Sequence, residues 1–343
     1  MFNNIIGLQI KFRIFLPIII GFSVFIFSCG GGEKSSETKE LQKQEADVLL
    51  VVPQFNQDSA YVYVKKQADF GPRVPNTPEH AACAEWLVNK LKIYTKDVIV
   101  QEAKARAYNG TVLNGKNIIA SFNSENQDRI LLCSHWDSRP YADHDPNPEN
   151  HKTPINGVND GASGVGVLLE IARQLNISNA KIGVDIILFD IEDYGEPQGL
   201  QTDKEDTWAL GSQYWSKNPH KQSYYAKYGI LLDMVGATDA KFTMEGTSMF
   251  YAPDIMKKVW EIAHRIGYGN YFLYQETNPI TDDHTYVNKN LKIPVIDIIH
   301  HESNTNTGFF EYWHTLKDDI NCIDKNTLKA VGQTMLTVIY EEK

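Results

Sequence analysis

Short apolar runs alternate with stretches of helical periodicity from about residue 58 to the end of the chain. The runs at 129–133 and 183–189 have the length and composition of buried strands. Between them, residues 161–175 place apolar side chains at the spacing of one helix face. Strands that alternate with helices predict an α/β fold, with a mostly parallel central twisted β-sheet flanked by helices on both faces.

The same pattern predicts the other elements. Helices are expected at 58–69, 78–94, 252–266 and 324–340, and strands at 97–101, 117–122, 230–232 and 294–299. The helix at 78–94 has the clearest start, with Thr77 as its N-cap and Pro78 in its first position. Asn114-Gly115 indicates a turn. No shift in composition divides residues 46–343, so we expect a single domain there.

The first residues have the composition of an export signal. Lys11 and Arg13 flank an apolar run at 14–27, which is typical of a signal-peptide core and short for a membrane span. The run ends at Ser28-Cys29-Gly30, which resembles a bacterial lipoprotein processing box. This resemblance implies a signal peptide at 1–28, lipidation of Cys29, and anchoring to a membrane on its periplasmic side. The alternative is a plain secretory signal with an incidental cysteine.

The composition of the chain predicts a tether before the domain and argues against two classes of protein. Residues 29–45 are polar and rich in Gly, Ser, Glu and Lys, which predicts a flexible tether before the domain at 46–343. The chain has 33 Lys+Arg, 43 Asp+Glu and no long basic run, which argues against nucleic acid as a partner. Its 4 cysteines are too few for a disulfide scaffold. Cys133 lies inside an apolar strand, where we expect a buried thiol.

Acidic and histidine residues follow several of the predicted strands. His135 and Asp137 come after one strand, Glu192 and Asp193 after another, and Asp233 after a third. In open α/β sheets, ligands bind beyond the carboxyl ends of the strands. Carboxylates gathered there would repel one another unless they shared a cation, and mixed Asp, Glu and His ligands suit catalytic zinc. This pattern alone predicts a metal-dependent α/β enzyme.

Six segments extend this prediction to a family. They are Ser134-His135-Trp136-Asp137-Ser138, Val158-Asn159-Asp160-Gly161-Ala162-Ser163-Gly164, Leu188-Phe189-Asp190-Ile191-Glu192-Asp193, Leu231-Leu232-Asp233-Met234-Val235-Gly236, Asp282-Asp283-His284 and Trp313-His314-Thr315. In this order they resemble the zinc-peptidase superfamily that contains secreted aminopeptidases and animal-type glutaminyl-peptide cyclotransferases. Asp282-Asp283-His284 and Trp313 directly before His314 resemble the cyclotransferase branch.

The resemblance implies an activity and a site. The substrates would be peptides and proteins with N-terminal Gln, converted to pyroglutamate with release of ammonia. It implies one zinc ion held by Asp160, Asp193 and His314, Glu192 as general acid/base, Asp233 and Asp282 as assisting carboxylates, and Trp313 as part of the pocket wall. The alternatives are a zinc aminopeptidase and a metal-free binding lipoprotein of the same fold. A monomer is favoured.

Two residues depart from the animal cyclotransferase pattern. Asp193 replaces a Glu, and its shorter side chain shifts the ligand geometry. Asp297 replaces a His near the active site, which leaves the role of that position open. In addition, five residues together cover all ligand positions of the two-zinc aminopeptidases, so a second metal ion stays open: His135, Asp160, Asp193, Asp233 and His314.

Each candidate also has a plainer interpretation. Asp160 and Asp282 could be helix N-caps, Glu192 and Asp193 a solvated acidic loop, Asp233 a strand-end residue bonded to backbone, and His314 a ring packed under Trp313. His135 could support the site or bind metal. Trp136 and Trp208 are expected in the core or at the rim of the site, and not as walls of a glutamine pocket.

Overall fold

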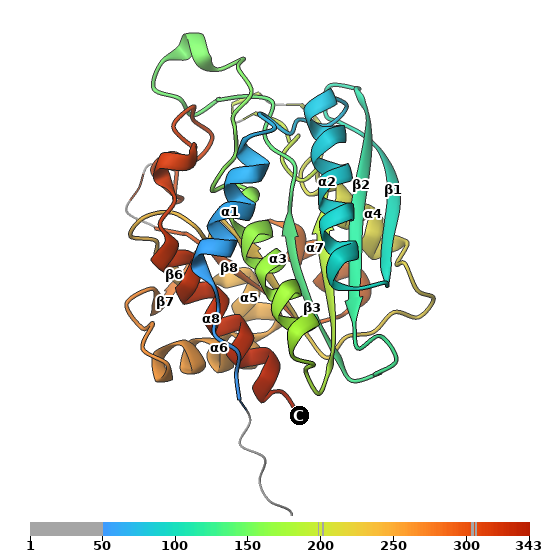
Figure 1. Ribbon diagram of the computed structural model, residues 1–343. Helices are drawn as coiled ribbons and strands as arrows, with labels where there is room; N and C mark the ends of the chain where they lie inside the picture. The colour runs from blue at the N-terminus through green and yellow to red at the C-terminus, as the bar shows by residue number, and fades with distance from the viewer. Residues whose placement is uncertain (1–50, 198, 201, 303–304, 306) are drawn as a thin grey trace, which may run out of the picture. The chain divides into compact units, whose positions relative to one another are not determined.

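The computed structural model describes residues 51–197, 199–200, 202–302, 305 and 307–343 (Figure 1). These residues belong to one compact unit. The predicted signal peptide, the tether and Cys29 lie outside the described residues. Within these ranges, no helix has both the length and the apolar character needed to cross a membrane.

A six-stranded sheet forms the centre of the domain. Its spatial order is β1-β2-β4-β3-β5-β8, built from β1 (Val98–Arg106), β2 (Val112–Phe122), β3 (Arg129–His135), β4 (Gly183–Phe189), β5 (Gly229–Asp233) and β8 (Val295–Ile299). Strands β4, β3, β5 and β8 run parallel, and β2 pairs antiparallel with both β1 and β4. The carboxyl ends of four neighbouring strands therefore meet at one edge, as the sequence pattern predicts.

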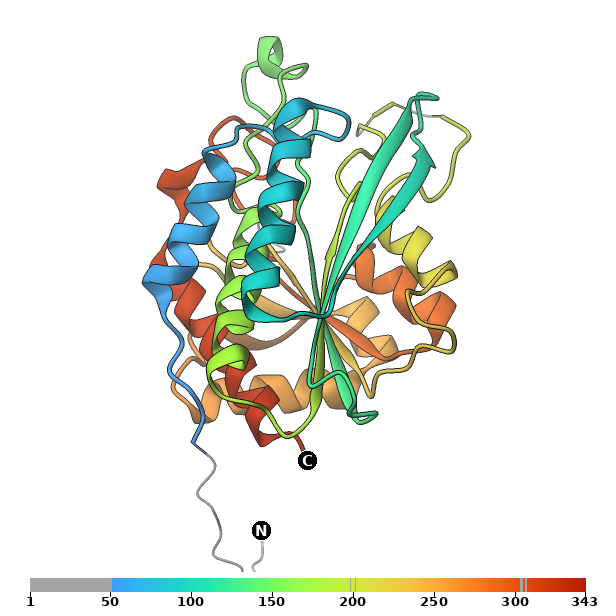
Figure 2. The same ribbon diagram turned by 45° about the vertical axis from the view of Figure 1, so that its right-hand side comes forward.

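Helices cover both faces of this sheet, which confirms the expected fold class. Figure 2 shows the sheet nearly edge-on, with the blue, cyan, green and red helices on one side and the yellow helix and the darker orange helix on the other. The helices are α1 (Gln57–Ala68), α2 (Pro78–Tyr94), α3 (Ala162–Ile177), α4 (Leu210–Lys217), α5 (Gly246–Tyr251), α6 (Pro253–Arg265), α7 (Asp283–Leu291) and α8 (Lys325–Glu341). Helices α1, α2, α3 and α8 share one face, and α4 and α7 pack together on the other.

Alternation along the strands explains why both faces are apolar. In β3, Leu132 packs in the core under α3, while Leu131 and Cys133 pack in the opposite core. Successive side chains of a strand point to opposite faces, so a strand covered on both sides reads as a continuous apolar run. Cys83, Cys133 and Cys322 are buried free thiols.

The prediction of a turn at Asn114-Gly115 is wrong. Both residues lie inside β2, paired with Lys104 and Ala103 of β1. Glycine is needed here for close approach, because a Cβ on Gly115 would lie 2.3 Å from the Cγ1 atom of Ile191. The actual turn lies between β1 and β2, where the N–H of Ala107 donates to the carbonyl of Thr111 at 2.9 Å.

Four short elements were missing from the expected list. Helices α4 and α5 follow β4 and β6 along the chain, and β6 (Phe242–Glu245) pairs with β7 (Phe272–Thr277) in a separate two-stranded sheet. Each of these elements is at most 8 residues long. Periodicity over so few residues cannot separate helix, strand and loop.

Candidate metal centre and active site

The ends of the parallel strands open into a cavity of about 250 Å³. All the proposed ligand, acid/base, assisting and wall residues lie in its lining, which consists of Asp160, Glu192, Asp193, Trp208, Asp233, Met234, Ile280, Thr281, Asp282, Ile299, Phe309, Trp313 and His314. These residues come from segments up to 154 positions apart in the chain, between Asp160 and His314. The sheet topology is therefore what assembles the site.

Three of these residues form a buried group that we call the outer triad: Asp160, Asp193 and His314. The Nε2 atom of His314 lies 3.5 Å from Asp160 Oδ2 and 3.2 Å from Asp193 Oδ1. Both carboxylate oxygens of Asp193 are buried without a hydrogen-bond partner. Burying carboxylate oxygens without hydrogen bonds is costly, and a bound cation would offset that cost. The outer triad also has the mixed carboxylate and imidazole composition of a cation site.

A second group, the inner triad, consists of His135, Asp160 and Asp233. Here the Nε2 atom of His135 lies 3.0 Å from Asp160 Oδ1 and 3.2 Å from Asp233 Oδ1. Burial by itself would lower the pKa of His135, but hydrogen bonds to Asp137, Asp160 and Asp233 raise it well above its ordinary value. In the inner triad, the imidazole of His135 therefore forms hydrogen bonds to both carboxylates through Nε2.

Two further carboxylates hold the backbone of the ligand segments. Asp137 accepts hydrogen bonds from the N–H groups of Glu192 and Asp193, both at 3.1 Å. Asp318 accepts from the N–H groups of Asn159 at 2.7 Å and Asp160 at 3.0 Å. Neither carboxylate had a role in the sequence-based prediction. The signals for Asp137 were its position after a strand and its place in the segment Ser134–Ser138, and Asp318 gave none.

Asp160 does not act as a helix N-cap, so that alternative is wrong. The N-cap of α3 is Gly161, which has a φ of 92°. A Cβ on Gly161 would lie 2.8 Å from the carbonyl oxygen of Asp137 and 2.9 Å from Cε1 of His135. Only glycine fits this position, and the turn it makes directs the Asp160 side chain toward His135 and His314.

The backbone is also strained at three residues that belong to the site or directly neighbour it. Ile191, Met234 and His314 have φ values of 56°, 48° and 56°. Such left-handed conformations cost about 1–3 kcal/mol each in residues other than glycine. Ile191 compensates by burying its side chain completely beside Leu113. The packing of the strand ends thus holds the site residues in conformations that an isolated chain would rarely adopt.

Glu192 and Asp193 do not form the solvated loop that was considered as an alternative. Asp193 is 1% exposed, and Glu192 lines the cavity. Burial raises the pKa of Glu192 well above its ordinary value, and the negative charges of Asp282 and Asp193 add to this effect. A carboxyl group with a raised pKa beside a cation site is suited to exchange protons with a substrate.

Asp282 combines two of the interpretations that the sequence left open. It is the N-cap of α7, and its side chain accepts a hydrogen bond from the N–H of Asp283. Its other oxygen, Oδ2, is buried without a partner, and the residue lines the cavity. The side chain of Asp233, in contrast, bonds to the His135 ring. The alternative in which Asp233 only bonds to backbone is therefore wrong.

Aromatic rings form the wall of the cavity. Trp313 stacks on His314 with ring centroids 3.7 Å apart, and Trp208 lies nearly parallel to His314, at 5.8 Å and 8°. His314 therefore packs with Trp313, as the plainer interpretation had it, and also faces the two aspartates. Trp136 is a core residue stacked on His80, as expected. Trp208 lines the cavity, so the expectation that it is not a wall residue is wrong.

Comparison with known proteins agrees with this geometry. The family model described as "Peptidase family M28" matches residues 117–339, a range that contains every residue of both triads. The chain belongs to peptidase family M28.

Two solved structures illustrate the similarity of this M28 chain to known relatives. A Bacteroides thetaiotaomicron glutaminyl cyclase bound to N-acetylhistamine is 55% identical, with a TM-score of 0.84, and the match covers 85% of this chain and 100% of that one. A Zn-dependent exopeptidase from Parabacteroides distasonis is 53% identical at the same coverage and TM-score. The glutaminyl-peptide cyclotransferase of Drosophila melanogaster is 25% identical, over 75% of this chain and 73% of its own.

The donor set of this M28 site fits zinc. Two carboxylates and one imidazole can supply three ligands, which leaves a fourth position open for substrate, as catalytic zinc sites do. The oxygens of Asp193 form no hydrogen bond in the structure and are available as ligands to such an ion.

Asp297, which replaces a His of the animal cyclotransferase pattern, lies in β8 and not in the cavity lining. It groups with Asp282 and His284. Burial, together with the nearby charges of Asp282, Asp233 and Glu245, raises its pKa well above the ordinary value. Asp297 is therefore a buried neighbour of Asp282 whose neutral form is favoured by its surroundings.

Proposed function

We propose that the chain is a glutaminyl-peptide cyclotransferase, which converts the N-terminal Gln of peptides and proteins to pyroglutamate and releases ammonia. The main support is the 55% identity to a bacterial glutaminyl cyclase along that chain's whole length. The cavity adds to this support, because it combines a cation site, a carboxyl group with a raised pKa and two tryptophans.

The reaction joins two parts of one residue. The α-amino nitrogen of the substrate Gln attacks its own γ-amide carbon, a C–N bond forms in a five-membered ring, and the bond to the amide nitrogen breaks. Because no external nucleophile takes part, much of the catalysis consists of holding a near-attack conformation. Zinc, when bound, polarises the γ-carbonyl and stabilises the negative charge that develops on its oxygen.

The side chains of the cavity transfer the proton, accept hydrogen bonds from the leaving amide and enclose the substrate. Glu192 accepts a proton from the attacking amine and returns it to the departing amide nitrogen, a service worth about 10²–10⁴-fold in rate. Asp282 offers its unpaired Oδ2 atom to the N–H groups of that amide. Asp233, held by His135, extends the same row of acceptors. Trp313 and Trp208 enclose the aliphatic part of the Gln side chain.

We further propose one zinc ion, held by Asp160, Asp193 and His314. The outer triad leaves the oxygens of Asp193 without partners, whereas the inner triad forms its own hydrogen bonds. His135 therefore supports Asp160 and Asp233 and does not act as a ligand.

A zinc aminopeptidase is the second candidate. It is favoured by the 53% identity to a Zn-dependent exopeptidase and by the five residues that cover both ligand sets. In that reaction Glu192 would activate a water molecule and a peptide bond would be cleaved.

The location of the protein is a separate proposal. We propose an exported lipoprotein, anchored by Cys29 and facing the periplasm, which the apolar run at 14–27 and the segment around Cys29 support. Growth of the producing bacterium with a labelled fatty acid tests this proposal, since C29A should leave the protein unlabelled. Labelling of C29A would contradict it.

One assay separates the two activities. The purified chain is incubated with two peptides that differ only in an N-terminal Gln or Ala, and the products are analysed by mass spectrometry. The proposal predicts that the Gln peptide loses the mass of one ammonia faster than it does without enzyme, and that the Ala peptide is unchanged. Release of free amino acids from either peptide would favour the aminopeptidase.

A further inference from the structure

Arg139, in the loop after β3, is a charged side chain with no exposure to solvent. Its Nε and Nη2 atoms donate to the two carboxylate oxygens of Asp143, each at 2.7 Å. Its Nη1 atom donates to the backbone carbonyls of Asp193 at 3.0 Å and Gly195 at 3.3 Å. The guanidinium group thus connects a carboxylate to the backbone of a proposed metal ligand.

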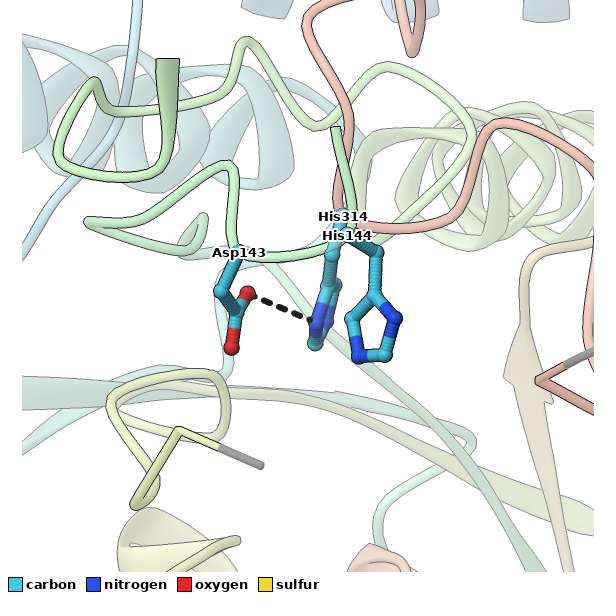
Figure 3. A group of neighbouring side chains, drawn as sticks. All are labelled: Asp143, His144 and His314. Carbon is cyan, nitrogen blue, oxygen red and sulfur yellow. Dashed lines mark ion pairs between the residues drawn. The ribbon is translucent and has the colours of Figure 1, made fainter. Parts of the chain in front are cut away.

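Asp143 in turn faces a second proposed ligand. Its Oδ1 atom lies 3.4 Å from Nδ1 of His314, the pair marked by the dashed line in Figure 3. The N–H of His144 donates to the carbonyl of His314 at 3.2 Å, which ties the two loops together. With Nδ1 facing Asp143, the Nε2 atom of the ring is directed at Asp160 and Asp193.

The same guanidinium group supports the aromatic wall. The Cζ atom of Arg139 lies 4.4 Å from the ring centroid of Trp208, and Trp208 is nearly parallel to His314. Arg139 therefore contacts or connects to two members of the outer triad and one wall of the cavity. The proposed mechanism assigns it no chemical step.

We propose that Arg139 and Asp143 are a positioning pair that orients His314 and the backbone of Asp193 for metal binding. A carboxylate at Nδ1 fixes the tautomer and the orientation of a ligating imidazole. The planar fork of Arg139 holds both oxygens of Asp143 and reaches two carbonyls at once, which the ammonium group of lysine cannot do. The inference rests on the proposed metal site and not on which reaction that site catalyses.

An opposing effect makes the direction of the test informative. The Nη1 atom of Arg139 also lies 3.7 Å from Oδ1 of Asp193, where a positive charge repels a metal ion. If this repulsion dominated, removal of Arg139 would tighten zinc binding. If positioning dominates, removal weakens binding, because partners of this kind contribute about 10–100-fold to metal affinity.

The zinc dissociation constants of R139M, R139K and D143N, measured by competition with a chromogenic chelator, test the pair. We expect zinc to bind about 10–100-fold more weakly in all three variants. The double variant R139M/D143N should bind zinc with the same affinity as whichever single variant binds it less tightly. The losses should not add, because both changes disrupt the same positioning pair. D143N keeps the size of the side chain and so tests the pair even if R139M fails to fold.

Arg129 provides a matched control. It forms the same forked pair with Asp185, at 2.6 and 2.8 Å, and it is buried near the start of β3. R129K should lower the melting temperature and leave zinc affinity unchanged.

Zinc binding as tight as wild type, or tighter, in R139M and D143N would overturn the proposal, and so would losses that add in the double variant. A wild-type protein that binds zinc but forms no pyroglutamate would refute the proposed function and leave the pair intact.

Discussion

The inner and outer triads share Asp160 but differ in how their charges are balanced. In the inner triad, one imidazole bridges two carboxylates at 3.0 and 3.2 Å. In the outer triad, both oxygens of Asp193 are buried without a partner. Burial and the charge of Asp160 raise the pKa of Asp193 to about 6. Similar residues can thus form either a hydrogen-bonded support or a cation site. The hydrogen bonds between imidazole and carboxylates, which the inner triad has and Asp193 lacks, distinguish the two.

Substitution of Asp193 should break this contrast most severely. D193N keeps the volume of the side chain but replaces a carboxylate ligand by an amide. We expect a loss of zinc affinity beyond the roughly 10–100-fold that second-layer partners contribute, together with loss of turnover at limiting zinc. Zinc content after dialysis and the rate of pyroglutamate formation measure the two effects. Full zinc occupancy in D193N would show that the ion binds elsewhere.

Substitution of Glu192 separates chemistry from metal binding. E192Q removes the proton acceptor and leaves the outer triad intact, so turnover should fall by about 10²–10⁴-fold while zinc stays bound. Steady-state kinetics and metal analysis on one preparation provide both numbers. Wild-type turnover by E192Q would contradict the role of Glu192.

Substitution of His135 tests whether the inner triad binds metal. H135N should retain one zinc ion per chain and lose about 10-fold in turnover, because His135 supports a ligand without being one. H80N is a suitable control for stability, since His80 is another buried histidine, 2.9 Å from both oxygens of Asp190. A fall from two zinc ions to one in H135N would assign His135 to a second metal site.

The pH dependence of zinc stabilisation is the smallest expected effect. Burial raises the pKa of Asp193 to about 6 and of Asp233 and Asp318 to about 7, from 3.8. In the metal-free protein, a raised pKa in the folded state means that folding favours the protonated form of each group. This contribution to stability is fully present below about pH 4 and is lost as the pH rises toward 7. Zinc stabilises the ionised form of Asp193.

The difference in melting temperature between zinc-loaded and chelator-treated protein should therefore widen from pH 5 to pH 8. Thermal unfolding in matched buffers checks this prediction. A difference that narrows over this range would contradict the linkage.

Sequence predicted the parts of the fold that depend on long periodic segments. The helix at Pro78–Tyr94 and the strand at Gly183–Phe189 have the expected bounds. The site was predictable where chemistry-bearing residues end or directly follow an apolar strand, as Asp233 ends β5. The short elements β6 and α4 contain no continuous apolar run and were not predicted, because contacts with distant segments determine them.

The supporting residues of the site were harder to predict. Arg139 and Asp143 lie in a polar loop where charged residues are common, and Asp318 lies far along the chain from Asp160. Their roles depend on hydrogen bonds to backbone groups, such as the 3.0 Å bond from Asp160 to Asp318. Any residue can supply a backbone N–H, so no sequence pattern indicates the partner.

Anomalous diffraction at the zinc absorption edge, on crystals of the zinc-loaded chain, would locate the metal. We expect one peak, within about 2.0–2.2 Å of a carboxylate oxygen of Asp160, one of Asp193 and Nε2 of His314. A second peak of similar height between His135 and Asp233, or a peak away from Asp193, would contradict this expectation.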